Sequence, residues 1–382
     1  MNQADYAKIH RTYAEIDLDA IRENGRIAKA AFPRQNILFV MKADAYGHGI
    51  EGILPAAETF ADEYAVATVE EGLAVRKGSE KPILLFGPVP EGKMALAAQN
   101  GLSFTVGSAE YAERLSDQLR RNGLSADCQL KIDTGLNRSG VRFWGENEGL
   151  SELRAIYSHE NLRFRGTYTH FACGEGADGW ERKFTTLQFE RFSKALQMME
   201  REGFPIGVRH CTSTGGSLVR TEYRMDMVRL GMLPLGMSYS NESVCSLGLS
   251  SVMTWKSFVA QIKHLEAGDA VSYGCTFRAE KPMRIGLVTC GYADGYRRAY
   301  SGKAEALVQG RRVRVLGRIA MDYMMIDLSD IPSAQLGEAV TLLGKDGDEW
   351  ISAQEISEWG ESVSGEVTAA ISHRVPRIYE NK

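Results

Sequence analysis

Short apolar, β-rich runs alternate with longer amphipathic stretches from residue 37 to residue 240. This alternation is typical of βα units around a parallel sheet. Several runs, such as 37–41 and 82–86, are continuously apolar, as expected of parallel strands that are buried on both faces. The candidate strands are 37–42, 63–68, 81–86, 102–107, 128–133, 164–171, 206–211 and 226–232. Eight such units predict an α/β fold of the (β/α)8 TIM-barrel type, with a doubly wound open sheet as the competing topology.

The C-terminal third of the chain has a different pattern. Its β-rich runs are separated by Gly and Asp turns, and no long helical stretch occurs before residue 352. We therefore predict a barrel over 12–240 and a mostly β domain formed by 1–11 and 241–382. An alternating segment at 13–18 predicts a lone strand that can join this second domain.

Composition and charge exclude several classes of function. The chain has 382 residues, 44% of them hydrophobic, and a net charge of −4, values typical of a globular protein. This balance gives no electrostatic footprint for nucleic acid or an anionic membrane, and no run reaches the roughly 18 apolar residues of a membrane span. The six cysteines form no C-x-x-C pair, so neither disulfides nor a metal site is predicted. We expect a cytoplasmic protein that acts on a small molecule.

Polar residues that directly follow apolar strands mark the active-site end of such a barrel. They are Lys42, Asp133, Arg138, His170, Ser213, Thr214 and Arg229. Lys42 ends a strand in the barrel interior, where an ammonium loses hydration and its pKa falls, which leaves a free amine for Schiff-base chemistry. A strand-end lysine can equally reach solvent along its methylene stem, so position alone does not decide between the two interpretations.

Two segments carry a specific resemblance. Residues 40–49 read V-M-K-A-D-A-Y-G-H-G, and residues 131–140 read K-I-D-T-G-L-N-R-S-G. They resemble the pyridoxal-phosphate (PLP) enzymes of fold type III, most closely the alanine racemase family. The resemblance implies that Lys42 holds PLP through an imine bond, and that Arg138 contacts the cofactor's phenolic oxygen and the substrate carboxylate, a use suited to its rigid donor fork. Lys131 matches a position that some members carry as a carbamylated lysine.

Two further strands extend the match, namely Y-T-H-F-A at 168–172 and D-M-V-R-L-G at 226–231. The resemblance implies that His170 packs beside the pyridine ring and that Arg229 contacts its nitrogen. A charged guanidinium can only donate to this nitrogen, so the ring becomes a weaker electron sink and a proton returns to Cα rather than being lost to transamination. The implied phosphate ligands are Tyr46, Thr214, Gly231 and Met232. A lone histidine in an apolar strand would otherwise be a core residue.

Racemisation needs a second acid/base on the opposite face of the substrate. The segment S-Y-G-C-T-F at 272–277 resembles the family segment whose tyrosine is this base and comes from the partner subunit. The resemblance therefore implies that Tyr273 is the second base and that the enzyme is a homodimer. By spacing alone Tyr273 equally fits a turn-flanking aromatic. The segment G-R-I-A-M-D at 317–322 implies that the Met321 amide binds the substrate carboxylate. The matching segments run from residue 11 to the end.

One position departs from the family pattern and leaves the substrate open. Gly365 stands where the family usually has a tyrosine that contacts the phosphate and crowds the substrate side chain. A pocket without this phenol admits larger side chains, which favours serine beside alanine. The alternatives to a PLP-dependent alanine racemase are a serine or broad-specificity racemase and a non-catalytic PLP-binding protein. The chain has neither the glycine triplet nor the E-P-G-R segment that are typical of PLP decarboxylases. It also has no H-x-H strand motif, which argues against a barrel hydrolase.

Overall fold

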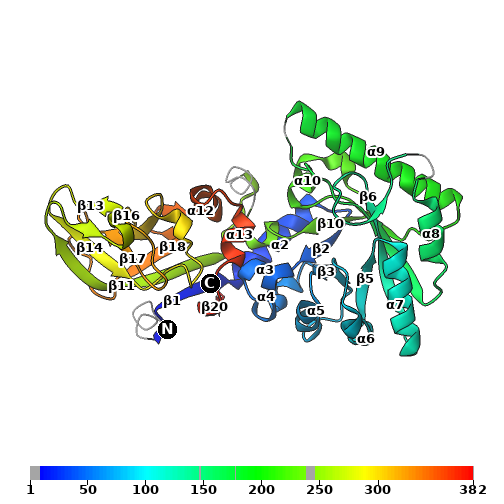
Figure 1. The fold of residues 1–382 in the computed structure, drawn as a ribbon, viewed down its shortest axis with the longest axis horizontal. Coiled ribbons are helices and arrows are strands. Elements are labelled where there is room, and N and C mark those ends of the chain that lie inside the picture. The colour runs from blue at the N-terminus through cyan, green and yellow to red at the C-terminus, as the bar shows by residue number, and fades with distance from the viewer. Residues whose placement is uncertain (1–8, 146–147, 177, 238–245, 382) are drawn as a thin grey trace. The chain divides into compact units, whose positions relative to one another are not determined.

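The computed structural model describes residues 9–145, 148–176, 178–237 and 246–381. They fall into two compact units (Figure 1). The barrel unit consists of Gly25–Ala45 and Ile50–Pro234. The β-rich unit contains the described residues up to Asn24, the segment Tyr46–Gly49 and the described residues from Leu235 onward. The predicted domain boundary at residue 240 lies outside the described residues.

Eight parallel strands build the barrel unit in the order β10-β2-β3-β4-β5-β6-β8-β9, with the short β7 (Val141–Arg142) beside β6. Their bounds are β2 (Asn36–Val40), β3 (Glu63–Val66), β4 (Ile83–Leu85), β5 (Leu102–Val106), β6 (Ala126–Asp133), β8 (Leu162–Tyr168), β9 (Val208–His210) and β10 (Met227–Leu230). The two end strands, β9 and β10, lie close together: the amide of Asp226, directly before β10, donates to the carbonyl of Arg209 in β9 at 3.1 Å. The barrel is therefore nearly closed, and the predicted barrel, rather than an open sheet, is confirmed.

Helices alternate with these strands and pack on the outside of the sheet (Figure 1). They are α2 (Leu18–Ala31), α4 (Ile50–Ala57), α5 (Val69–Arg76), α6 (Glu91–Gln99), α7 (Ala109–Arg121), α8 (Leu150–Tyr157), α9 (Gly179–Arg201) and α10 (Thr214–Val219). In α7 the apolar face packs inward with Leu115 and Leu119 buried, and the hydroxyl of Ser108 accepts from the Tyr111 amide at 3.2 Å, which caps the first turn. The amphipathic pattern therefore fixes which side of each helix meets the sheet.

The β-rich unit is a nine-stranded sheet in the order β19-β18-β15-β16-β17-β14-β11-β1-β20, with a further pairing of β18 with β11. The bounds are β1 (Thr12–Asp17), β11 (Met253–Leu265), β14 (Met283–Val288), β15 (Glu305–Val308), β16 (Arg311–Leu316), β17 (Met324–Asp327), β18 (Ala339–Asp346), β19 (Glu349–Ile351) and β20 (Arg377–Glu380). Two short helices follow, α12 (Ala353–Trp359) and α13 (Ser364–Ala369). Trp255, Tyr296 and Tyr300 are fully buried and form the aromatic centre of this unit.

The first strand joins the second sheet, as the alternating segment at 13–18 predicted, so it lies outside the barrel unit. The sequence assigned 12–240 to the barrel, but β1 pairs with β11 and β20 in the other sheet. The Tyr13 ring stacks on Phe258 of β11 at 5.9 Å, and the Thr12 hydroxyl donates to the Lys256 carbonyl at 2.8 Å. These contacts bury β1 inside the β-rich unit, between β11 and β20.

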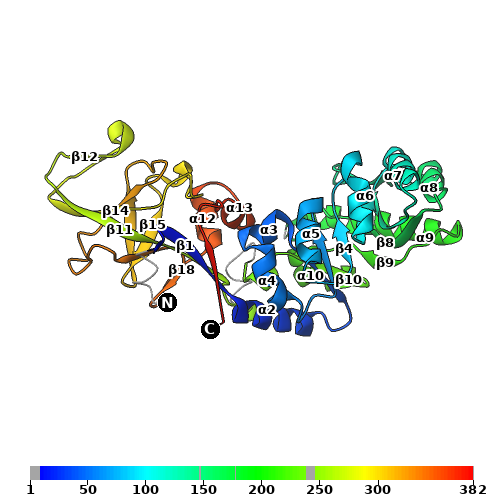
Figure 2. The same cartoon turned by 90° about the horizontal axis from the view of Figure 1, so that it is seen from below.

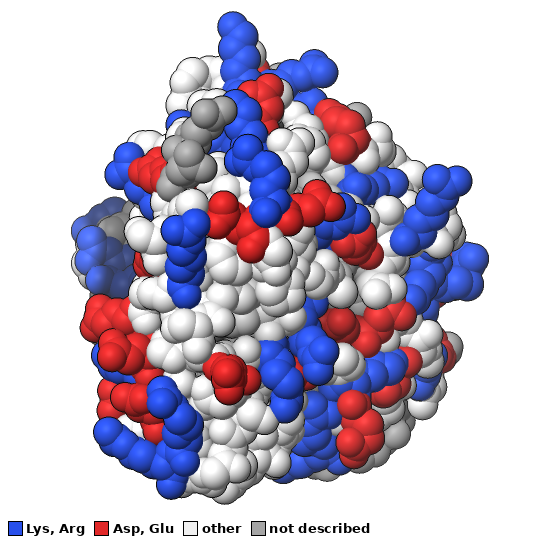
Figure 3. Space-filling model, turned by 90° about the vertical axis from the view of Figure 1, so that its right-hand side faces the viewer, with Lys and Arg blue, Asp and Glu red and all other residues white. Residues whose placement is uncertain are grey.

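The described residues show neither a region of one charge sign on the face in Figure 3, nor a membrane-spanning helix, nor a metal cluster. Lys and Arg side chains alternate with Asp and Glu across the face shown in Figure 3, without a large region of one sign. Among the described residues no helix combines the length and the apolar character that crossing a bilayer requires. Within the same residues there is no group of three His, Cys, Asp or Glu side chains arranged to hold a metal ion.

Candidate active site

Lys42 follows β2 and begins α3 (Lys42–Gly47), a turn of unusual hand. The four residues 43–46 all have φ between +52° and +54°, so the turn is left-handed. Such a backbone costs about 1–2 kcal/mol for each residue with a side chain, and it persists where the surrounding structure enforces it. One restraint is the Asp44 carboxylate, which accepts from the Ile50 amide at 2.7 Å. The chain thus makes an abrupt turn directly after the lysine.

The environment of Lys42 favours a neutral amine. Its side chain is exposed at the end of the strand rather than enclosed in the barrel interior as predicted. The surrounding protein still removes part of the hydration of the ammonium, which lowers the pKa of Lys42, and the positive charge of Arg138 lowers it further. The carboxylate of Glu71 acts in the opposite direction. An amine with a lowered pKa is a better nucleophile toward a carbonyl group at neutral pH.

Arg229 of β10 lies in the barrel interior with only 4% of its surface exposed, and its guanidinium donates four hydrogen bonds. Nη1 donates to Nδ1 of His210 at 2.9 Å, and Nη2 donates to Nδ1 of His170 at 2.9 Å. Nη2 also donates to the backbone carbonyls of Thr169 and Cys211, each at 3.0 Å. Since a guanidinium has no acceptor, both histidine Nδ1 atoms must be unprotonated.

Both histidines are held in the neutral form. Burial and then the charge of Arg229 lower the pKa of His170 to about 2 and hold the pKa of His210 well below its usual value. Nε2–H of His210 donates to Oε1 of Gln129 at 2.7 Å, which fixes its tautomer. The His210 ring also stacks on Tyr168 with a centroid separation of 4.7 Å. The guanidinium therefore remains a fixed cation among neutral groups.

Two further cations lie around this centre. Arg138 is exposed in the loop after β6, and its charge acts on Lys42, Lys131 and His170. Lys131 is buried on β6, and its Nζ donates to the Ser139 hydroxyl at 2.6 Å. Burial, followed by the charges of Arg138 and Arg229, lowers the pKa of Lys131 to about 8. The barrel mouth thus gathers positive charge, which favours anionic ligands.

Three of the four residues predicted to hold a phosphate lie after β9 and β10, namely Thr214, Gly231 and Met232. The Gly231 amide donates to the Thr214 hydroxyl at 3.1 Å, and the buried Met232 follows directly. A Cβ on Gly215 would lie 1.9 Å from the carboxyl carbon of Glu175. The Glu175 carboxylate also accepts from the Gly215 amide, and burial raises its pKa to about 7. The Gly215 amide therefore points at an acidic oxygen of the chain itself, which shows that this backbone offers a hydrogen-bond donor to an oxygen ligand.

The remaining predicted site residues belong to the β-rich unit. Tyr46 groups with this unit, and its carbonyl accepts from Nδ1–H of His48 at 3.1 Å. Tyr273 is 67% exposed and Met321 is 52% exposed. Tyr273 borders an open hollow whose other lining residues are Tyr292, Arg297, Arg298 and Ile319. A phenol beside two guanidinium groups suits a ligand that carries a carboxylate.

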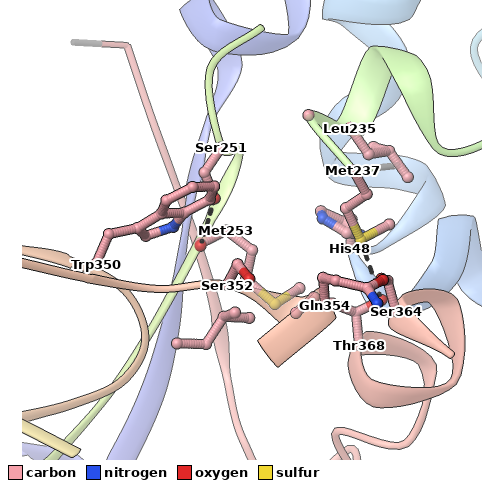
Figure 4. A pocket seen from close by; sticks show the side chains of 13 residues that line it. His48, Leu235, Met237, Ser251, Met253, Trp350, Ser352, Gln354, Ser364 and Thr368 are labelled. Atoms are coloured by element: carbon pink, nitrogen blue, oxygen red, sulfur yellow. Dashed lines mark hydrogen bonds between the residues drawn. The ribbon is translucent and has the colours of Figure 1, made fainter. Parts of the chain in front are cut away.

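A second, narrow pocket of the β-rich unit holds none of the predicted site residues (Figure 4). The side chain of His48 lines it, and the Ser364 hydroxyl, also in its lining, donates to Oε1 of Gln354 at 3.0 Å. Gly365, the position that departs from the family, is half-buried in α13 directly after Ser364. The helix α13 therefore lines this pocket of the β-rich unit, and the pocket adds no reactive group to the candidate active site.

The sequence missed three residues of the site. His210 and Gln129 support the guanidinium of Arg229, and Glu175 covers the backbone of Gly215. Both His210 and Gln129 are polar residues inside strands of a barrel, and that signal was available in the printed sequence. Nothing in the local sequence of Glu175 marks it, because its role depends on a loop that folds back onto α10.

Comparison with known proteins gives a consistent result. The sequence model of the alanine racemase N-terminal domain matches residues 16–238, and that of the C-terminal domain matches residues 252–379. The alanine racemase of Symbiobacterium thermophilum is 35% identical over 370 residues, covering 96% of this chain and 97% of that protein. The alanine racemase of Methanococcus maripaludis is 36% identical over 375 residues, covering 97% of this chain and 99% of that protein.

Solved structures match over the same length. The alanine racemase from the D-cycloserine producer Streptomyces lavendulae superposes with a TM-score of 0.89 at 34% identity, and 98% of each chain is covered. The alanine racemase from Bacillus anthracis, solved with bound L-Ala-P, superposes with a TM-score of 0.88 at 32% identity, covering 98% of this chain and 96% of that one. The likeness therefore extends over both units and is not confined to the barrel.

The lowered pKa of Lys131 predicts a specific pH dependence of stability. Its pKa is about 8 in the folded protein and near the usual value of 10.5 in the unfolded chain, so the unfolded state binds more protons between these values. The contribution of Lys131 to the free energy of unfolding should therefore rise from pH 8 to pH 10.5. Urea unfolding at several pH values should show this rise in the wild type and a smaller one in Lys131→Met. Equal slopes for the two proteins would contradict the assignment, and Lys77→Met, at an exposed site, is the control.

Proposed function

Because these matches cover nearly the whole chain, it belongs to the alanine racemase family and is an isomerase of that type, as its motifs predicted, and we propose that it interconverts L-alanine and D-alanine with PLP and two bases. The two bases are Lys42 and Tyr273 of the partner subunit. The observation that carries the proposal is the buried guanidinium of Arg229, held by two neutral histidines close to an amine with a lowered pKa. The reaction takes place in a cytoplasmic homodimer.

The residues at the barrel mouth fit the cofactor. PLP, when bound, supplies an electron sink that is conjugated to the α-carbon of the amino acid. Lys42 would hold it covalently through its amine, and Arg229 and His170 would lie against its ring. The phosphate ligands would be Tyr46, Thr214, Gly231 and Met232. The Gly215 amide, which donates to the Glu175 carboxyl group, supports this site, because it is a backbone donor in the same cradle.

Arg229 tunes the chemistry toward racemisation. Burial lowers its pKa to about 10, so the guanidinium stays protonated at neutral pH. Its four hydrogen bonds to neutral acceptors fix its orientation, and it has no proton that it can give up at that pH. A group that donates without transferring a proton limits how much charge the ring nitrogen accepts. A proton then returns to the α-carbon faster than it adds elsewhere.

Lys42 and Tyr273 divide the proton transfers between the two faces of the substrate. The amine of Lys42 accepts or returns the α-proton on one face, and the phenol of Tyr273 does so on the other. Arg138 and the amide of Met321 hold the substrate carboxylate, which keeps the α-carbon between the two bases. The hollow beside Tyr273, with Arg297 and Arg298 in its wall, supports the approach of a carboxylate from this side.

Lys42→Ala should abolish both racemisation and the visible absorption of the protein incubated with PLP. Without its amine the chain has no covalent attachment for the cofactor at this site. Absorption spectra and chiral analysis of L-alanine incubations measure the two effects. Lys77→Ala removes an exposed lysine that pairs with Glu51, and it should change neither. A retained band in Lys42→Ala would place the cofactor on another residue.

Mixed dimers test whether the two bases come from different subunits. Lys42→Ala and Tyr273→Phe homodimers should each be nearly inactive, because each lacks one base in both sites. Co-refolded mixtures should regain about a quarter of the wild-type activity per chain, since half of the dimers carry one intact site. Activity of the mixture no higher than that of the parent variants would mean that both bases act within one subunit.

The substrate range depends on Gly365. Without a phenol at this position the space beside the substrate side chain should admit the hydroxymethyl group of serine, so we infer that serine is racemised as well as alanine. Gly365→Tyr should lower the ratio of kcat/KM for serine to that for alanine by about 10-fold or more. Gly365→Ala is the control and should leave the ratio within about twofold. A ratio in Gly365→Tyr equal to that of the wild type would remove Gly365 from the determinants of specificity.

A further inference from the structure

The turn that carries Tyr273 has a strained backbone. Ser272 has φ 60° and ψ −174°, a conformation that is nearly restricted to glycine. Gly274 and Cys275 follow with φ of 74° and 50°, so the backbone on both sides of the tyrosine lies in the left-handed region. Strain of this kind persists only where neighbouring groups hold it, and it is frequent at reaction sites. The contacts of this turn therefore bear directly on the position of the phenol.

The hairpin itself gives the turn little support. It consists of β12 (Ala270–Val271) and β13 (Phe277–Arg278), which pair only with each other. Figure 2 shows β12 on an arm that extends away from the main sheet of this unit. The base of the hairpin is fixed, because Val271 and Ala279 lie in a buried apolar cluster and the Ala279 amide donates to the Asp269 carbonyl at 2.8 Å. The ladder of two residue pairs leaves the turn itself to contacts with another segment.

That segment is Gly317–Ile319, which lies against the turn. The Ser272 hydroxyl donates to the backbone carbonyl of Arg318 at 2.5 Å. The Arg318 guanidinium covers Gly274, where a Cβ would lie 3.1 Å from Nη1. Gly317 has φ +66°, and a Cβ on it would lie 2.6 Å from the Val271 carbonyl, so the two segments touch without a side chain between them. One hydroxyl, one guanidinium and one glycine thus contact the backbone on both sides of the tyrosine.

The supporting segment is fixed in turn by its own hydrogen bonds. The Ile319 amide donates to the Ser301 hydroxyl at 3.0 Å, and the Ala320 amide donates to the Tyr323 carbonyl at 2.9 Å. It continues into Met321, whose carbonyl accepts from the Ala293 amide at 3.0 Å. Arg318 therefore stands on a braced loop that also carries the residue proposed to hold the substrate carboxylate.

We propose that Ser272 and Arg318 are positioning residues that fix the Tyr273 phenol for proton transfer on its face of the substrate. This inference rests on the proposed function, because it concerns the second base of that reaction. Proton transfer requires donor and acceptor atoms about 2.6–3.2 Å apart, and a displacement of 1 Å can cost about 10²-fold in rate. A turn that relaxes out of the left-handed region moves the phenol by such an amount. Lys42 belongs to the other unit, so its proton transfer on the opposite face of the substrate should be unaffected.

Two substitutions of Ser272 separate the effect of losing its hydroxyl group from the effect of backbone strain at this residue. Ser272→Ala removes the bond to Arg318 and leaves a side chain at φ 60°, so the turn should relax. Ser272→Gly also removes the bond, but glycine adopts this backbone without strain. We expect kcat for racemisation to fall about 10- to 100-fold in Ser272→Ala and less in Ser272→Gly, with KM within about twofold in both. Ser158→Ala, which deletes a serine-to-carbonyl bond at the end of α8, is the matched control and should be unchanged.

The decisive measurement follows each face separately. L-alanine and D-alanine labelled with deuterium at the α-carbon are incubated with each protein, and loss of the label to water is compared with inversion. In Ser272→Ala we expect loss from the enantiomer that meets Tyr273 to fall with kcat, whereas loss from the enantiomer that meets Lys42 continues without inversion. The absorption of the bound cofactor should equal that of the wild type, since Lys42 and the cradle are untouched.

The outcomes distinguish the positioning role of Ser272 and Arg318 from the proposed function. Equal loss of exchange from both enantiomers in Ser272→Ala, or wild-type kinetics, would overturn the positioning role of Ser272. Arg318→Met should reproduce the one-sided defect and Arg318→Lys should restore part of it, and an effect on KM alone would overturn the role of Arg318. A wild-type protein without racemisation, or a Tyr273→Phe variant that still inverts alanine, would instead contradict the proposed function.

Discussion

Burial of the Arg229 guanidinium is the constraint on which the rest of the site depends. A cation that leaves water costs several kcal/mol unless hydrogen bonds replace its hydration. Arg229 recovers this cost with four acceptors, two histidine nitrogens and two backbone carbonyls, which come from the ends of two neighbouring strands. The same bonds tie β8, β9 and β10 together where the barrel is least completely closed. Fold closure and reaction centre therefore rest on one side chain.

The charge of Arg229 also sets the protonation of its neighbours. Burial lowers the pKa values of Lys131, His170 and Lys42 most; the charges of Arg138 and Arg229 lower those of Lys131 and His170 further, and Arg138 does the same for Lys42. The nearby carboxylate of Asp133 raises the pKa of Lys131, but its effect is smaller than those of burial, Arg138 and Arg229. Excess positive charge stabilises anions, so phosphate and carboxylate groups are the natural ligands of the barrel mouth.

Much of this arrangement follows from the sequence, because several barrel strands are continuous apolar runs and most candidate residues of the barrel lie in or directly after its strands. The periodicity gave all eight barrel strands, and the motifs gave Lys42, Arg138 and Arg229. The sequence does not encode the hand of a turn in an obvious way, so the left-handed residues after Lys42 were missed. The alternating pattern of 13–18 indicated a strand that can join the β-rich unit, but it could not name the partners of β1, which lie more than 200 residues away. Glu175 was missed for the same reason, since only the folded loop brings it to Gly215.

Both proposed bases border a left-handed backbone, and the two cases have one physical cause. A base must project from the end of a rigid element, yet the chain has to leave the reaction space within a few residues. Positive φ values directly after Lys42 and beside Tyr273 bend the chain away from the course that a continuing strand would take. After Lys42 the redirected chain is held by Asp44 on Ile50, and beside Tyr273 it is held by Ser272 on Arg318. In each unit a side chain that performs no chemistry thus stabilises a backbone that would otherwise relax, and the reactive group beside it has few conformations left to lose when the transition state forms.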